Sequence, residues 1–115
     1  LNTLAELELQ RDLVLPFSLE RIAGLIAALK KFAATGDEAA RLAQEEIFSN
    51  ENSQKALTGF YGGLKDPAFL AQKAKEEKAL RERIAADPAK EKLYGSAWGE
   101  LARAAEQFRV FYKDY

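Results

Sequence analysis

The sequence contains neither histidine nor cysteine among its 115 residues. Histidine is the commonest general base and a frequent metal ligand, and the cysteine thiolate is both a nucleophile and a soft ligand. These absences exclude the Ser–His and Cys–His nucleophile pairs and the usual zinc, haem and iron–sulfur sites. A di-iron bundle is excluded as well, because it needs Glu-x-x-His on facing helices. We expect no catalytic residue, no metal ligand and no cofactor-binding residue in this chain.

β-Branched residues and long apolar runs are also scarce. Val, Ile and Thr together occupy nine positions, whereas Ala alone occupies 21. That balance favours helices over sheets. The apolar runs span only a few residues, far short of the roughly 20 that a membrane-spanning helix needs. The net charge of −1 provides no field that would attract nucleic acid. The sequence therefore predicts an all-α chain with neither a membrane nor a nucleic acid as partner.

Methionine is absent too, and the chain opens on Leu1 without the pattern of a signal peptide. We expect a piece of a longer protein, whose function is part of the function of its parent. Within residues 1–115 no linker rich in Gly, Ser or Pro divides the chain. The length suits one small domain, so we predict a single antiparallel bundle or array of about five helices.

The first half of the chain predicts helices separated by breakers. Apolar residues spaced for one face indicate a helix over residues 1–13, which Pro16 should end because it disfavours helical geometry at the residue before it. Ser18 then stands at an expected N-cap. The second helix has the widest apolar stripe, so we expect it to be the most buried, and Gly36 should close it.

The second half repeats a clear start signal. Asp66-Pro67 predicts a helix over about residues 67–85, and Asp87-Pro88 predicts another start. The last helix should follow a short turn near Gly95. Six of its residues recur at heptad spacing, which is typical of helix packing and favours a core role over a ligand platform. They are Tyr94, Trp98, Leu101, Ala105, Phe108 and Tyr112.

A polar stretch, Ser49-Asn50-Glu51-Asn52-Ser53, interrupts the helical pattern that starts at Asp37 and resumes towards Leu64. Its asparagines have poor helix propensity, so we expect two helices or one kinked helix here. Two interpretations remain open: the stretch caps and breaks a helix, or it forms a polar patch that faces a site. The adjacent pairs Glu45-Glu46 and Glu76-Glu77 are interpreted as surface charge, because neighbours on a helix point about 100° apart.

Several segments, taken in order, resemble the bacterial dipeptidyl-peptidase 7 / 11 family. They are ELQRD (8–12), LPF (15–17), IFSNENSQKA (47–56), a glycine-containing stretch with LKDP (59–67), AKEE (74–77), IAADP (84–88) and YGSAW (94–98). The similarity covers nearly all of the chain. No single segment is diagnostic, and the specificity comes from their common order and spacing.

The resemblance implies both a function and a place in a larger enzyme. Members of that family are secreted or periplasmic serine exopeptidases that release dipeptides from peptide N-termini. Their catalytic unit is a chymotrypsin-like double barrel that carries His, Asp and Ser, with an inserted all-helical domain capping the active site. This chain resembles part of the helical domain and lacks the barrel segments. It should therefore be inactive alone, and its implied partners are the barrel of the parent enzyme and, through it, a peptide substrate.

The resemblance also implies one binding residue. A helical-domain asparagine of the family helps to hold the substrate α-amino group, and Asn52 is the best match, with Asn50 as the nearby competitor. Gln54 departs from the family pattern, where arginine or another residue is expected. The chemistry is suitable, because an α-ammonium group only donates hydrogen bonds and an amide oxygen accepts them.

The alternative is a freestanding helical module for protein–protein interaction, with no enzyme attached. The open reading frame of the parent would decide, since the peptidase interpretation requires a half barrel with His and Asp upstream and a Gly-x-Ser-Gly-like segment downstream. The sequence does not fix side-chain specificity or oligomeric state. We expect exposed apolar surface that promotes self-association at one of two places. These are Val14, Leu15 and Phe17, or Phe111, Tyr112 and Tyr115.

Overall fold

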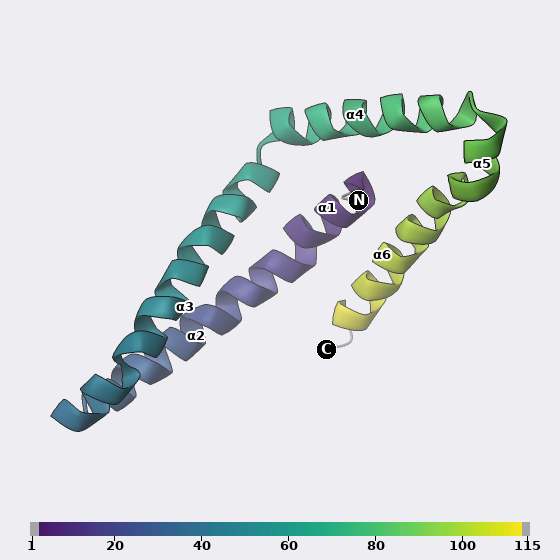
Figure 1. Ribbon diagram of the computed structural model, residues 1–115. Helices are drawn as coiled ribbons and strands as arrows, with labels where there is room; N and C mark the ends of the chain where they lie inside the picture. The colour runs from purple at the N-terminus through teal and green to yellow at the C-terminus, as the bar shows by residue number, and fades with distance from the viewer. Residues whose placement is uncertain (1–2, 114–115) are drawn as a thin grey trace. The chain divides into compact units, whose positions relative to one another are not determined.

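The computed structural model describes residues 3–113, and all regular structure in that range is helical (Figure 1). The all-α prediction is confirmed. The described residues form six α-helices and one π-helix rather than about five helices. They divide into two compact units. The first unit combines the chain up to Leu13 with the chain from Gly63 onward, and the second unit comprises Val14–Gly62. Leu1 and Tyr115 lie outside the described residues.

The first unit is built around the short helix α1 (Leu4–Leu9), which packs against α4 (Pro67–Ala85) and α6 (Ala97–Lys113). Helix α5 (Pro88–Tyr94) follows α4 and packs against it. The buried apolar side chains of this unit include Leu7, Leu9, Leu64 and Ala105. The N-terminal helix thus supplies much of the core of its unit.

Thr3 caps α1, a feature that the sequence interpretation missed. Its Oγ1 accepts a hydrogen bond from the backbone N–H of Glu6 at 3.2 Å. The backbone N–H of Leu4 donates to Oε1 of Glu77 on α4 at 3.4 Å. Two N–H groups that no helix carbonyl can satisfy are therefore paired by side chains. Thr-x-x-Glu is the sequence signature of such a start and could have located it.

Pro16 does not end the first helix, which corrects the prediction. A π-helix, η1 (Gln10–Val14), continues α1 directly into α2 (Leu15–Ala33), and Ser18 lies inside α2 rather than at its N-cap. In a regular α-helix the proline ring would crowd the carbonyl four residues earlier. The wider π turn lies just before Pro16, and it lets the chain stay helical through the proline.

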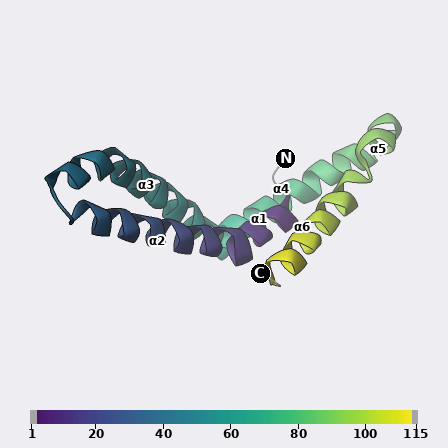
Figure 2. The same cartoon turned by 90° about the horizontal axis from the view of Figure 1, so that it is seen from below.

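The second unit consists mainly of two antiparallel helices, α2 and α3 (Asp37–Leu64), which lie side by side in both views (Figures 1 and 2). Gly36 lies between them, but Ala34 is the C-cap of α2 and no described glycine has a positive φ. The prediction that α2 is the most buried helix is wrong, because only Leu15 and Ile26 of its 19 residues are buried. A helix with one helical neighbour buries only a narrow stripe.

The polar stretch neither breaks nor caps a helix. Helix α3 runs through it without interruption over 28 residues, about 42 Å at 1.5 Å per residue. Asn50 donates from Nδ2 to the carbonyl oxygen of Glu46 at 2.7 Å, so its side chain bonds to its own helix. Thr58 does the same with Gln54, also at 2.7 Å. The expected break is wrong because these side chains satisfy themselves on the helix without opening its backbone ladder.

Both Asp-Pro signals are confirmed as helix starts. The Asp66 carboxylate accepts from the backbone N–H of Ala68 at 3.0 Å, and α4 covers the predicted range. The Asp87 carboxylate accepts from the N–H groups of Ala89 and Lys90 at 3.1 and 3.3 Å. None of the described helices is long and apolar enough to cross a membrane.

The heptad seam of α6 is only partly a core. Ala105 is buried, and Trp98, Leu101 and Tyr112 are half-buried. The prediction is wrong for two residues. Tyr94 is the last residue of α5 rather than part of α6 and is 54 % exposed, and Phe108 is 52 % exposed. Helix α6 packs most extensively against the six-residue α1, which is too short to cover a seam of five turns.

Candidate functional site

The two candidate asparagines occupy opposite faces of α3. Two residues advance a helix by about 200°, so Asn50 and Asn52 point in nearly opposite directions once the helix is continuous. The side chain of Asn50 is half-buried, and that of Asn52 is exposed. One ligand cannot contact both side chains from the same side of the helix.

Asn50 belongs to the inner stripe of α3. The buried and half-buried residues of this helix recur every three or four positions, which marks one face. They are Ala39, Ala43, Ile47, Asn50, Gln54, Leu57, Tyr61 and Leu64. Gln54, the residue that departs from the family pattern, lies on the same stripe. The polar stretch is therefore not one patch, because Asn50 lies on the inner stripe and Asn52 lies opposite it.

A shallow hollow lies beside the polar stretch on the second unit, but it includes neither asparagine. Residues of α3 line it together with the end of α2: Ala33, Ala40, Arg41, Gln44, Ile47, Phe48 and Glu51. Glu51 also forms an ion pair with Lys30 of α2, with 3.6 Å between Oε2 and Nζ. Exposed pairs of this kind stabilise by about 0–1 kcal/mol. The surface of the hollow is mostly apolar, and its polar residues are Arg41, Gln44 and Glu51.

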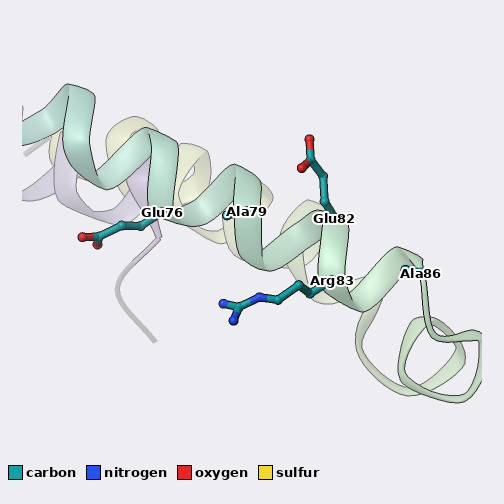
Figure 3. Close-up of a pocket in the computed structure, with 5 residues that line it drawn as sticks. All are labelled: Glu76, Ala79, Glu82, Arg83 and Ala86. Carbon is teal, nitrogen blue, oxygen red and sulfur yellow. The ribbon is translucent and has the colours of Figure 1, made fainter.

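A second hollow lies on α4 alone (Figure 3). Glu76, Ala79, Glu82, Arg83 and Ala86 line it, and Figure 3 shows Glu82 extending to the opposite side of the helix from Glu76 and Arg83. Because α4 and its C-cap residue Ala86 provide every lining residue, the hollow is space between long surface side chains rather than an enclosed pocket.

The neighbouring carboxylates Glu76 and Glu77 have separate partners. Glu76 is exposed and lies 3.4 Å from Nζ of Lys73. The Glu77 side chain is only 15 % exposed, accepts the hydrogen bond from α1 and lies 4.0 Å from Arg81. The two carboxylates do not share a proton or a ligand, as the angle between adjacent helix positions requires. Glu76 is surface charge, whereas Glu77 has a structural role that its sequence context did not reveal.

The most perturbed carboxylate of the described chain is Asp12 in the π-helix. Its Oδ1 accepts from Nε of Arg11 at 2.7 Å, and its Oδ2 lies 3.1 Å from Nη2 of Arg109 on α6. The hydrogen bond from Arg11 lowers the pKa of Asp12, and Arg109 lowers it further, against partial desolvation. The sequence interpretation did not assign this cluster a role, although the adjacent Arg11-Asp12 pair is visible in it. The cluster joins the π-helix to α6 within the first unit.

The described residues 3–113 hold no group of three acidic side chains arranged to bind a metal ion. Comparison with curated proteins and with solved structures finds no match to the chain. The sequence model of one protein family, Peptidase S46, matches residues 1–115. Because the match covers the whole chain, the chain belongs to the Peptidase S46 family.

Proposed function

We propose that this chain is the helical cap segment of a dipeptidyl-peptidase, where it helps to bind the substrate N-terminus. Three observations support the proposal. The chain belongs to a peptidase family over its whole length, its described residues are helical, and it contains no histidine. The resemblance places the catalytic His, Asp and Ser on a barrel, so the hydrolytic chemistry belongs to another part of the parent enzyme.

Asn52 is the proposed contact with the substrate amine. The observation that carries this assignment is the exposed position of Asn52 on the outer face of an unbroken helix. An exposed amide oxygen is free to accept a hydrogen bond from an α-ammonium group. Asn50 is the weaker candidate, because it faces the inner stripe and its Nδ2 already donates to Glu46.

An amine contact on a rigid helix accounts for release of dipeptides. Two residues of extended peptide span about 7 Å, so a fixed acceptor for the amine sets which peptide bond reaches the catalytic serine. A longer or shorter N-terminal stretch would leave either the amine or the scissile bond out of place. The cap would thereby convert an endopeptidase barrel into an exopeptidase. The same family assignment leads us to propose a periplasmic or secreted location.

The test is made in the full-length parent enzyme with Asn52→Ala and Asn50→Ala as a matched pair. Removing a hydrogen bond to a charged group costs about 1.5–3 kcal/mol, so Asn52→Ala should lower kcat/KM roughly ten- to hundredfold. Asn50→Ala should leave kcat/KM nearly unchanged. An N-acetylated substrate has no ammonium group, so it should be poor with the wild-type enzyme and should lose little more with Asn52→Ala.

Other outcomes have distinct meanings. If Asn52→Ala keeps full activity and Asn50→Ala loses it, the inner asparagine is the contact. If both variants keep full activity, neither asparagine binds the amine. The freestanding interaction module remains the alternative to the whole proposal, and a parent reading frame without the barrel segments would favour it.

A further inference from the structure

The chain passes between its two compact units at two places, and both are locally weak points in a helix. The first crossing lies at residues 13–14, inside the π-helix η1. The second lies at residues 62–63, near the C-terminal end of α3, where two glycines are adjacent. The two weak points coincide with the unit boundaries although they lie about 50 residues apart in sequence.

The π turn weakens the first crossing. π-Helices are rare and occur mostly as single turns inserted into α-helices. Pro16 follows within one turn, and because it has no N–H it cannot donate to the helical ladder. The helical hydrogen-bond pattern therefore changes register up to Val14 and lacks a donor at Pro16.

The glycine pair weakens the second crossing. Glycine populates the helical conformation about fivefold less than alanine at an interior position. A Cβ atom built on Gly62 or Gly63 would meet no atom within 4 Å, so close packing does not require glycine at either position. Gly95 differs, because a Cβ there would approach Glu91 too closely. What Gly62 and Gly63 provide is backbone freedom at the boundary.

Each unit contains an ion pair that joins two of its own elements. In the first unit, Asp12 is paired with Arg109 at 3.1 Å, one residue before the boundary at Leu13. In the second unit, the ion pair between Lys30 and Glu51 joins α2 to α3. Neither of these ion pairs spans a crossing, so each joins elements of one unit only.

We propose that the π turn and the Gly62–Gly63 pair form a two-point hinge, about which the α2–α3 hairpin turns as one body. The π turn lies where the chain enters the hairpin, and the glycine pair lies where the chain leaves it. The hairpin therefore cannot rotate at one of these points without rotating at the other. The hinge stands independently of the proposed peptidase role. A further consequence does rest on that role: Asn52 lies on the hairpin, so the hinge would move the amine contact.

The first experiment measures distance distributions between spin labels. The native chain has no cysteine, so pairs of cysteines can be introduced without background labelling. Ala34→Cys with Lys92→Cys reports across the two units, and Ala27→Cys with Lys55→Cys reports within the hairpin; all four positions are exposed. The hinge predicts a broad distribution for the first pair and a narrow one for the second. Two narrow distributions, or two broad ones, would overturn it.

The second experiment stiffens the hinge. Gly62→Ala together with Gly63→Ala should narrow the distance distribution across the units, because each alanine favours the helical conformation over glycine by up to about fivefold. Gly59→Ala is the matched control, since it also lies in α3 with open space around it but three residues away from the boundary. Equal narrowing by the control variant, or no narrowing by the double variant, contradicts the proposal.

A third measurement requires no substitution. Amide hydrogen exchange at residues 12–15 and 62–64 should be faster than at the centres of α2 and α3, because hinge opening exposes those backbone groups. Uniform protection along both helices would count against the hinge. Circular dichroism of each variant checks that helix content is retained.

Discussion

Replacing Trp98 by Ala tests whether the half-buried seam of α6 holds the first unit together. Trp98 is half-buried, and the guanidinium carbon of Arg81 lies 4.7 Å from its ring centroid. A large aromatic buries 150–250 Å² when fully enclosed, so half burial removes about 100 Å² from water. At 25–30 cal/mol per Å² that contributes about 3 kcal/mol. The cation–π contact adds about 0.5–1 kcal/mol.

The expected loss in the free energy of unfolding is therefore about 3–4 kcal/mol, measured by urea unfolding of the 115-residue chain. Trp98→Phe should cost clearly less, because it retains an aromatic ring under Arg81. The variants Trp98→Ala, Arg81→Ala and their combination form a double-mutant cycle, whose coupling energy should be about 0.5–1 kcal/mol. A loss below about 1 kcal/mol for Trp98→Ala would refute the burial argument. A coupling energy near zero would refute the cation–π contribution alone.

Three further predictions concern stability and association. Leu64→Ala should lower the free energy of unfolding by about 2–5 kcal/mol, because Leu64 is fully buried. Leu93 is 70 % exposed, so Leu93→Ala should change it by less than about 0.5 kcal/mol. Urea unfolding of both variants makes the comparison. Asp12 has a lowered folded-state pKa, so it stabilises above its ordinary pKa of 3.8 and loses that contribution as the pH falls through the lowered value. Asp12→Asn should therefore reduce the decrease in the free energy of unfolding as the pH falls below 3.8. An unchanged decrease would contradict this prediction. The double variant Phe108→Ser/Phe111→Ser should self-associate less than the wild type at high concentration, because the two side chains are 52 % and 60 % exposed. Sedimentation measures the association. Equal association of wild type and variant would exclude these two residues as the contact surface.

The place of the exposed apolar surface illustrates what the sequence pattern can decide. Of the two locations expected from sequence, the one around residues 14–17 is not open, since Leu15 is 3 % exposed and its apolar neighbours are half-buried. At the α6 location Phe111 is 60 % exposed, Tyr112 is half-buried and Tyr115 lies outside the described residues. Phe108, which was not part of that expectation, lines a shallow hollow with Phe111, Ala104 and Gln107. Periodicity identifies an apolar face, but whether a neighbour covers it depends on the lengths of the packed helices.

Helix starts were predictable where one side chain decides them. Asp66 and Asp87 each bond to N–H groups two or three residues later, so the signal and its effect lie within one turn. The breakers were not predictable by the same local rules. Pro16 is accommodated by the π turn before it, and Asn50 by a bond to its own helix. The free-energy cost of a helix-disfavouring residue depends on whether the neighbouring turns can adjust their hydrogen bonds to it. Residue type alone does not reveal that.

The candidate site depends on this same point. If the polar stretch ended one helix and began another, Asn50 and Asn52 could converge on one ligand, and the sequence could not separate them. An unbroken α3 sets them about 200° apart, so the two assignments become mutually exclusive. The paired substitutions therefore test a geometric consequence of helix continuity as well as a binding residue. Suppose that Asn50→Ala and Asn52→Ala lose activity equally, and that neither variant still prefers a substrate with a free amine over an N-acetylated one. That result would mean that α3 is broken at the polar stretch when substrate is bound.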